Sequence, residues 1–235
     1  MATKKLKITV TKKKINIKKI ILTLIILLGL CFFAAYILNK PLTNIYISGN
    51  NILSDKEIIE ISELTDYPPF IDMYFSNIEE KLLKNPYIKK TNIKKKFTKI
   101  YIDVEEYKPI AIYNNKLLLS SKKKVDNNYR IDYVPYLTNN IDNIYDKFVD
   151  SFNKIDNEIL LKISHIEYAP NEVDKERFIL YMVDSNYVYV TLNKITKINK
   201  YNSIINELDN KKGIIYLDSG DYIEIKDWHN KALII

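Results

Sequence analysis

One uninterrupted apolar run constrains everything else that this chain can fold into. Residues 20–38, IILTLIILLGLCFFAAYIL, contain no charged side chain. As a helix, these residues would rise about 28 Å, which is close to the hydrocarbon thickness of a bilayer. Such a helix is apolar on every side and has no polar face to turn to water. The run is therefore predicted to be a membrane span.

The lysines that flank this run predict its orientation. Residues 1–19 hold eight lysines and no acidic residue. Because lysine next to a span is retained on the cytoplasmic side, residues 1–19 are predicted to be a cytoplasmic basic tail, residues 20–38 a transmembrane helix, and everything from residue 41 onward extracytoplasmic. A cleaved signal peptide fits poorly, since the run is long and a phenylalanine would stand at the −3 position of either candidate cleavage site. A lipoprotein fits poorly too, because Leu30 precedes Cys31 where a small residue is needed.

Two features of the composition exclude classes of function. The net charge of +7 suggests nucleic-acid binding, but without the eight tail lysines 28 of the 36 basic residues remain against 29 acidic ones, a balance of −1. The basic excess is confined to the tail, so no nucleic-acid partner is expected. The single cysteine, Cys31, lies inside the predicted span, so the exported part has neither an intrachain disulfide nor a thiol nucleophile.

The first exported segment, residues 41–109, shows three strand patterns. Residues 43–48 alternate apolar and polar side chains and end at Gly49-Asn50, residues 87–94 form a plausible second strand, and residues 99–105 carry the clearest alternation. These strands are predicted to form a small three-stranded sheet.

Two helices are predicted between the first and second of these strands. Capping boxes at Ser54–Glu57 and at Ser76–Glu79 indicate where the helices begin. Pro68-Pro69 and Asn85-Pro86 indicate where they end. The predicted order is therefore strand, helix, helix, strand, strand, with both helices on one face of the sheet.

The residues at the ends of these predicted strands and helices resemble those of a known domain. They are Ile45, Ile47, Gly49, Asn50, Leu53, Ser54, Asn85, Pro86, Tyr87, Ile88, Ile102, Val104, Glu105, Pro109 and Ala111. In this spacing they resemble the POTRA domain of bacterial cell division proteins of the FtsQ/DivIB family. The resemblance implies a basic tail, one span and a POTRA domain over residues 41–109, with Glu105 in a motif at the junction with the next domain. Family members usually carry an aromatic–Pro pair before the third strand, where this chain has Phe97-Thr98.

The second exported segment, residues 110–228, is predicted to be a mixed β-sheet domain with helices. Its predicted strands are 110–113, 116–119, 133–137, 166–169, 177–182, 187–192, 214–217 and 222–225. Its predicted helices are 141–152, 159–163 with Asp156 as the cap, and a third that carries Ile198, Tyr201, Ile205 and Leu208. Asn114-Asn115 is predicted to be a tight hairpin turn, residues 120–129 a polar loop, and residues 229–235 a tail.

This segment resembles the C-terminal β domain of the same family. The matching residues are Ile155, Asp156, Ile163, Ser164, Ile166, Glu167, Lys197 and Tyr201. The predicted fold class is thus α+β: a transmembrane helix, a POTRA domain of order βααββ and a mixed β-sheet domain.

No catalytic, cofactor-binding or metal-binding site is predicted. The chain has no Gly-rich phosphate loop, and its two histidines, His165 and His229, have no neighbouring ligand residues. Ser164 and His165 are adjacent on a predicted strand, so their side chains point to opposite faces and cannot form a nucleophile–base pair. The adjacent carboxylates Glu105 and Glu106 are interpreted as solvated residues at a strand end. The protein is therefore predicted not to be an enzyme.

The last predicted hairpin is the expected partner-binding site. Its outer strand, residues 221–226, has no later strand to cover it, and an uncovered edge can pair with a strand of another protein. In the alternative interpretation, residues 227–235 fold back over this edge. The candidate residues are Tyr216, Asp221, Tyr222, Ile223, Glu224, Ile225 and Trp228.

The resemblance implies a function in cell division. It implies a membrane scaffold at the division septum that binds other single-span division proteins, FtsL and FtsB (DivIC), and through them regulates the septal peptidoglycan synthase. The alternative is a POTRA protein of envelope protein assembly or secretion, but such proteins generally bring several POTRA units and a β-barrel. An anchored sortase would need a cysteine outside the membrane.

Overall fold

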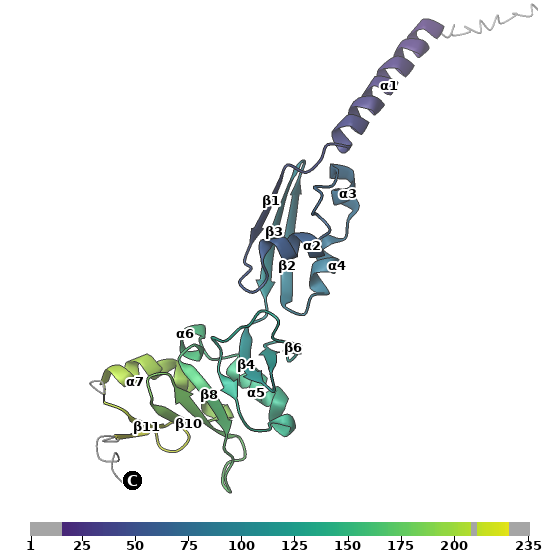
Figure 1. The fold of residues 1–235 in the computed structure, drawn as a ribbon. Helices are drawn as coiled ribbons and strands as arrows, with labels where there is room; N and C mark the ends of the chain where they lie inside the picture. Colours follow the sequence, from purple (N-terminus) through teal and green to yellow (C-terminus); the bar gives the residue numbers. More distant parts are fainter. Residues whose placement is uncertain (1–15, 208–210, 226–235) are drawn as a thin grey trace, which may run out of the picture.

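Three parts follow one another along the long axis of the molecule (Figure 1). The computed structural model describes residues 16–207 and 211–225, which form an apolar helix, a three-stranded sheet with helices, and a nine-stranded mixed sheet with helices. The α+β class and this order of parts confirm the sequence-based prediction.

The apolar run forms helix α1, Ile17–Leu38. None of its residues is buried within the protein, and in the described residues it is the one helix long and apolar enough to cross a membrane. It begins before the predicted residue 20 and takes in Lys18 and Lys19. Most of the predicted basic tail, residues 1–15, lies outside the described residues.

Backbone hydrogen bonds attach the residues that follow α1 directly to the POTRA region. The backbone N–H of Phe70 donates to the carbonyl oxygen of Lys40 at 2.9 Å, and that of Leu42 donates to the carbonyl oxygen of Pro68 at 3.1 Å. The N–H of Thr43 donates to the carbonyl oxygen of Thr98 at 2.7 Å. Only Asn39 separates the end of the helix from these contacts, so no flexible linker follows the predicted span.

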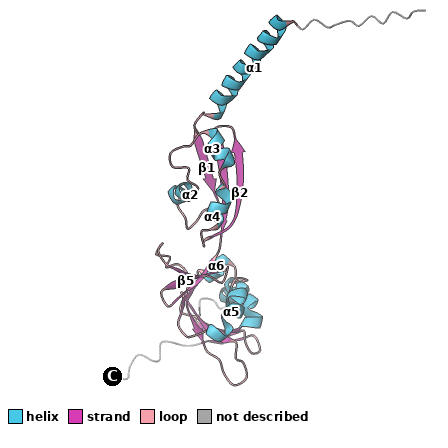
Figure 2. Ribbon diagram, turned by 90° about the vertical axis from the view of Figure 1, so that its right-hand side faces the viewer, coloured by secondary structure: helices cyan, strands magenta, loops and turns pink. Residues whose placement is uncertain are grey.

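The POTRA region has the predicted three-stranded sheet, in the order β1-β3-β2. Strand β1 (Asn44–Ser48) runs parallel to β3 (Lys99–Glu106), and β2 (Ile88–Lys96) runs antiparallel to it. Ile100, Ile102 and Val104 of β3 are buried, as their alternation predicts. Helices α2 (Asp55–Ile61), α3 (Phe70–Phe75) and α4 (Ile78–Leu83) cover one side of the sheet, as Figure 2 shows.

One of the two predicted capping boxes is confirmed and the other is wrong. Ser54 accepts from the N–H of Glu57, whose carboxylate accepts from the N–H of Ser54 at 2.8 Å. Ser76 instead ends α3, a helix that sequence analysis missed, and its hydroxyl donates to the carbonyl oxygen of Met73. Helix α4 starts without a side-chain cap. The predicted stop at Pro68-Pro69 does not end α2 either, because α2 already ends at Ile61. Pro69 instead directly precedes α3, where its missing N–H is not needed.

The interpretation of Glu105 and Glu106 as two solvated carboxylates is wrong for Glu106. Its carboxylate accepts three backbone N–H groups, from Asn51 at 2.9 Å, Ile52 at 2.7 Å and Leu53 at 2.9 Å. Glu105 is exposed and pairs with Lys89 at 2.5 Å. The second glutamate, rather than the first, therefore holds the loop between β1 and α2.

The nine-stranded sheet has the order β12-β11-β10-β9-β8-β7-β4-β5-β6. Its strands are β4 (Pro109–Tyr113), β5 (Lys116–Leu119), β6 (Lys124–Asp126), β7 (Tyr136–Leu137), β8 (Ile163–Tyr168), β9 (Arg177–Met182), β10 (Tyr187–Thr191), β11 (Gly213–Tyr216) and β12 (Tyr222–Ile225). The predicted hairpin turn is confirmed, since Asn114 and Asn115 have φ of 50° and 60°.

Three predictions in this part are wrong in detail. Residues 120–129 are not all loop, because β6 pairs with β5; the backbone ladder forms there although the side chains are polar, as suits an edge strand. The predicted strand 133–137 is reduced to β7. The predicted helix from Ile141 begins as the 3-10 segment η1 (Asp142–Ile144) before α5 (Tyr145–Phe152).

The remaining helices also differ from their predicted bounds. Helix α6 (Asn157–Leu160) follows Asp156, whose side chain makes no capping hydrogen bond, and Ile163 already belongs to β8. The third predicted helix is the 3-10 segment η2 (Leu192–Lys200) followed by α7 (Tyr201–Glu207). Leu208, predicted on its apolar face, lies outside the described residues.

The two sheets share an apolar core. Strand β5 reads Lys-Leu-Leu-Leu, and its alternation sends Leu118 into the core of the nine-stranded sheet but Leu117 and Leu119 into the core of the POTRA region. Ile112, Ile131 and Val134 belong to that second core as well.

Polar contacts reinforce the shared core. Tyr129 donates its hydroxyl to Glu57 of α2 at 2.9 Å, and its ring meets that of Tyr87 edge-on at 5.1 Å. Burial, together with the hydrogen bond to Glu57, raises the pKa of Tyr129 to about 12. The POTRA region and the β domain are thus packed as one body.

The contribution of the Glu106 carboxylate to stability can be tested by substitution, with the neighbouring Glu105 as the control. Glu106→Gln replaces two acceptor oxygens with one acceptor and an amide that repels the facing N–H groups, so it should lower the free energy of unfolding by about 1.5–3 kcal/mol. Glu105→Gln removes an exposed ion pair and should cost less than about 1 kcal/mol. Chemical denaturation of the two variants measures the difference, and equal losses would contradict the assignment.

Candidate functional site

The described residues show no arrangement typical of catalysis. The Ser164 hydroxyl donates to the carbonyl oxygen of Tyr181 at 2.8 Å, while the ring of His165 stacks on Tyr136 at 5.8 Å between ring centres. The two side chains face away from each other, as expected on β8. In residues 16–207 and 211–225, no group of three or more His, Cys, Asp and Glu side chains could hold a metal ion.

The candidate site is strand β12, one edge of the nine-stranded sheet. It pairs antiparallel with β11, with Tyr216 opposite Tyr222, Ile215 opposite Ile223 and Gly213 opposite Ile225. In the part of the chain that the structure describes, no strand pairs with the other side of β12. The backbone groups on that side are therefore available to a strand of a partner. Trp228 and the rest of the tail that covers the edge in the alternative interpretation, residues 227–235, lie outside the described residues.

The two faces of β12 differ. On one face, which Tyr222 shares with Glu224, the side chain of Tyr222 is 51% exposed. On the opposite face Ile223 is half-buried and packs against the core of the sheet, whereas Ile225, at the end of the strand, is 50% exposed. Glu224 is exposed and accepts a hydrogen bond from the hydroxyl of Tyr216 at 3.2 Å. The strand thus offers an aromatic ring and an apolar side chain beside its unpaired edge.

A row of stacked tyrosines supports the outer face of this edge. The rings of Tyr189 on β10 and Tyr216 on β11 stack at 5.0 Å, and those of Tyr216 and Tyr222 stack at 4.5 Å. Sequence analysis did not identify this row, although the alternation of each strand would place the three tyrosines on one face. Stacking holds the ring of Tyr222 in place before any partner binds.

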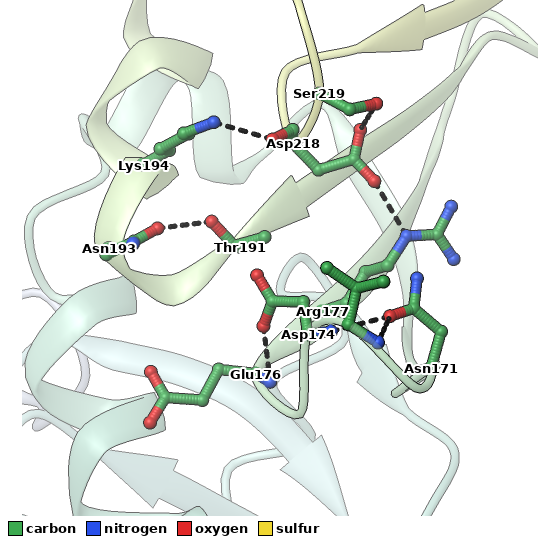
Figure 3. A network of polar contacts seen from close by, with 10 residues as sticks. Asn171, Asp174, Glu176, Arg177, Thr191, Asn193, Lys194, Asp218 and Ser219 are labelled. Atoms are coloured by element: carbon green, nitrogen blue, oxygen red, sulfur yellow. Dashed lines mark hydrogen bonds and ion pairs between the residues drawn. The ribbon is translucent and has the colours of Figure 1, made fainter.

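The turn between β11 and β12 is held by charged side chains from β9 and from the 3-10 segment η2. The guanidinium of Arg177 on β9 donates to the carboxylate of Asp218 at 2.7 Å (Figure 3). The same guanidinium lies over the ring of Tyr189 at 4.2 Å. The ammonium of Lys194 donates to the carbonyl oxygen of Asp218 at 2.6 Å. Asp221, at φ of 51°, pairs with Lys197 at 2.5 Å. The pattern of residues 218–220 predicts this turn, but sequence analysis did not connect Asp218 with Arg177 or Lys194, because no local pattern links these residues.

The five POTRA motif residues lie elsewhere. Gly49 and Asn50 form the turn after β1, Pro86 precedes β2, Glu105 ends β3 and Pro109 begins β4. Gly49 has φ of 82°, and a Cβ there would stand 2.1 Å from the carbonyl oxygen of Val104, so only glycine fits. The five motif residues therefore lie at strand ends and turns of the chain, apart from the β12 residues.

Known proteins are similar to this chain over the POTRA region and over most of its whole length. The family described as "POTRA domain, FtsQ-type" matches residues 40–107. The cell division protein DivIB of Bacillus subtilis is 30% identical over 208 residues, covering 82% of this chain and 77% of the relative. DivIB of Bacillus anthracis is 30% identical over 232 residues, covering 93% and 87%. The solved major extracytoplasmic domain of DivIB from Geobacillus stearothermophilus is 21% identical, with a TM-score of 0.38, covering 45% of this chain and 96% of that domain.

The ion pair at the β11–β12 turn predicts a pH dependence. Burial alone would raise the pKa of Asp218, but the hydrogen bonds from Arg177 and Ser219 outweigh burial and hold the pKa below its usual value. A lowered pKa in the folded state adds stability above the unfolded-state pKa of about 3.9, and this stability is lost as the pH falls through the folded-state pKa. Asp218→Asn should therefore cost about 1.5–3 kcal/mol at pH 7, and this cost should shrink below about pH 4.

Unfolding free energies of the original chain and the variant between pH 7 and pH 3 measure this effect. Asp150→Asn is the control, since Asp150 pairs with Lys122 at 2.9 Å but its side chain is 60% exposed. A pH-independent difference for Asp218→Asn would contradict the role assigned to the ion pair.

Proposed function

Because this chain belongs to the FtsQ/DivIB family of bacterial cell division proteins, we propose that it is a single-span scaffold of the division complex that works by binding partners rather than by catalysis. The relatives that support the family assignment are cell division proteins aligned over most of their length. In the proposed topology α1 crosses the membrane, the lysine-rich tail remains in the cytoplasm, and residues from 41 onward lie outside.

We place partner binding at the uncovered edge of β12, and this edge is the observation that carries the proposal. A partner strand added there would satisfy the free backbone groups of β12, which supplies affinity without demanding a particular sequence. Tyr222 and Ile225, each about half exposed, would lose their remaining contact with water under such a strand. Side chains on alternate positions of the partner strand would then supply specificity.

The proposed partners are the single-span division proteins of the FtsL and FtsB (DivIC) type. They would be held beside this chain in the same membrane, so each binding event occurs at a high effective concentration and weak contacts suffice. Through these partners the scaffold would recruit and regulate the septal peptidoglycan synthase. The site needs no cofactor and no small-molecule substrate.

The structure shows which substitutions test this edge most sharply. Tyr222→Lys and Ile225→Lys change exposed side chains, whereas Ile223→Lys also places a charge against the core and would confound binding with stability. Tyr222→Lys should weaken capture of an FtsB-type partner at least tenfold, which corresponds to about 1.4 kcal/mol. Co-purification with the purified exported part of that partner measures the loss.

The control is Val173→Lys, which makes the same kind of change at a side chain that is 95% exposed and distant in sequence from β12. It should bind like the original chain. If Tyr222→Lys and Ile225→Lys both retain full binding while remaining folded, the site is not at β12.

The cellular function predicts a location as well. A fluorescent fusion of the full chain should concentrate in a band at midcell, because a scaffold of the division complex assembles where the septum forms. A uniform signal around the envelope throughout the cell cycle would contradict the division function and would favour a general envelope-assembly role.

A further inference from the structure

We propose that the end of the POTRA region nearest α1 docks on anionic lipid headgroups. This membrane-proximal tip consists of α3 and the turn between β2 and β3, residues 70–75 and 94–99. Figures 1 and 2 both show α3 and this end of the sheet beside the end of α1. The inference rests on the proposed function in one respect only, that α1 spans the membrane.

The clamp at the exit of α1 sets the distance between the tip and the bilayer. Lys40, whose carbonyl oxygen accepts from the N–H of Phe70, is two residues beyond the last helical residue, Leu38. Two extended residues reach about 7 Å. The headgroup layer on each side of the hydrocarbon core is about 5–8 Å thick. Phe70 and its neighbours are therefore held at the depth of the headgroups.

The turn at the tip presents an aromatic ring at a strained position. Phe97 has φ of 46°, a left-handed conformation that bulky residues rarely adopt and that glycine adopts readily. Its ring is 47% exposed and contacts Phe70 at 5.8 Å between ring centres. A strained backbone that displays an exposed apolar ring points to a role beyond folding. An exposed phenylalanine ring held at this depth can bury its apolar surface at the boundary between headgroups and acyl chains.

Three lysines beside this turn have no ionic partner. Lys94, Lys96 and Lys99 are exposed, and no carboxylate of the described residues forms an ion pair with any of them. Lys95, between them, is used internally: its ammonium donates to the carbonyl oxygens of Met73 at 2.7 Å, Tyr74 at 3.1 Å and Ser76 at 3.2 Å.

The opposite end of the same strand differs in part. There Lys89 is paired with Glu105, whereas Lys90 is exposed and forms no ion pair with a carboxylate of the described residues. The acidic residues on the α3 side of the tip are Asp66 and Asp72, fewer than the four lysines 40, 94, 96 and 99. The excess positive charge therefore lies at the end that faces the bilayer, where it attracts anionic headgroups.

The test uses the full chain inserted through α1 into lipid nanodiscs, either neutral phosphatidylcholine or phosphatidylcholine with phosphatidylglycerol. Trp228→Phe with Phe97→Trp places the single tryptophan at the turn, and a spin label on the lipid headgroup quenches its fluorescence on contact. Quenching should be at least twofold stronger in the anionic discs. Adding Lys94→Glu, Lys96→Glu and Lys99→Glu should return it to the neutral-lipid value.

The matched control carries Lys56→Glu, Lys90→Glu and Lys154→Glu, an equal change of charge at exposed lysines away from the tip. It should retain the stronger quenching in anionic discs. Equal quenching in the two lipids, unaffected by the tip substitutions, would show that the tether alone brings the tip close and would overturn the proposal, as would the absence of quenching. Partner capture measured on the same samples tests the β12 site separately. Failure of the lipid-docking proposal can therefore be distinguished from failure of the proposed function.

The strain at Phe97 gives a second readout. Phe97→Gly relieves the left-handed backbone and Phe97→Ala does not, although both remove the ring. The glycine variant should melt about 2–4 °C higher than the alanine variant. Equal melting temperatures of the two variants would show that the backbone at Phe97 is not strained, and would contradict the role assigned to this conformation.

Discussion

The structure depends on three consecutive leucines that join two cores. Strand alternation directs Leu118 into the core of the nine-stranded sheet and its neighbours, Leu117 and Leu119, into the core of the POTRA region, and all three are fully buried. A fully buried leucine contributes about 1.5–3 kcal/mol relative to an exposed one, so the two regions cannot separate without a large loss. Glu106 and Tyr129 add polar contacts at the same junction.

This junction lies between the two ends of the molecule that the proposed scaffold function uses. At one end, backbone hydrogen bonds clamp the exit of α1 to Phe70 and Pro68. At the other end, Arg177 and Lys194 hold the turn that presents β12. If β12 binds partners and α1 spans the membrane as proposed, the apolar cluster between these two ends would hold the edge of β12 at a fixed distance and orientation from the membrane. A stiff scaffold raises the effective concentration of partners in the same membrane more than a flexible one, because a larger share of its conformations places the binding surface within reach of the partner.

The features that sequence analysis predicted correctly are those with local patterns. Alternation identified β3, the Ser54–Glu57 box identified the start of α2, and two asparagines identified the β4–β5 turn. The resemblance at the strand joints identified the family. The errors have different causes. Strand β6 forms through the backbone although its sequence is polar, and Ser76 bonds back to Met73 and so serves α3 instead of α4. The contact of Asp218 with Arg177 was missed because it spans 41 positions. The edge position of β12 was predicted, but the tyrosine row behind it was not.

The central claim is that the POTRA region and the β domain form one rigid body. Spin labels at Lys56 on α2 and Asp146 on α5, in a chain carrying Cys31→Ser, would measure this directly through the distribution of distances between them. A single narrow distribution, unchanged when the chain is moved from detergent into nanodiscs, is the predicted result. A broad distribution or two separate distances would show that the junction is a hinge and would contradict the account.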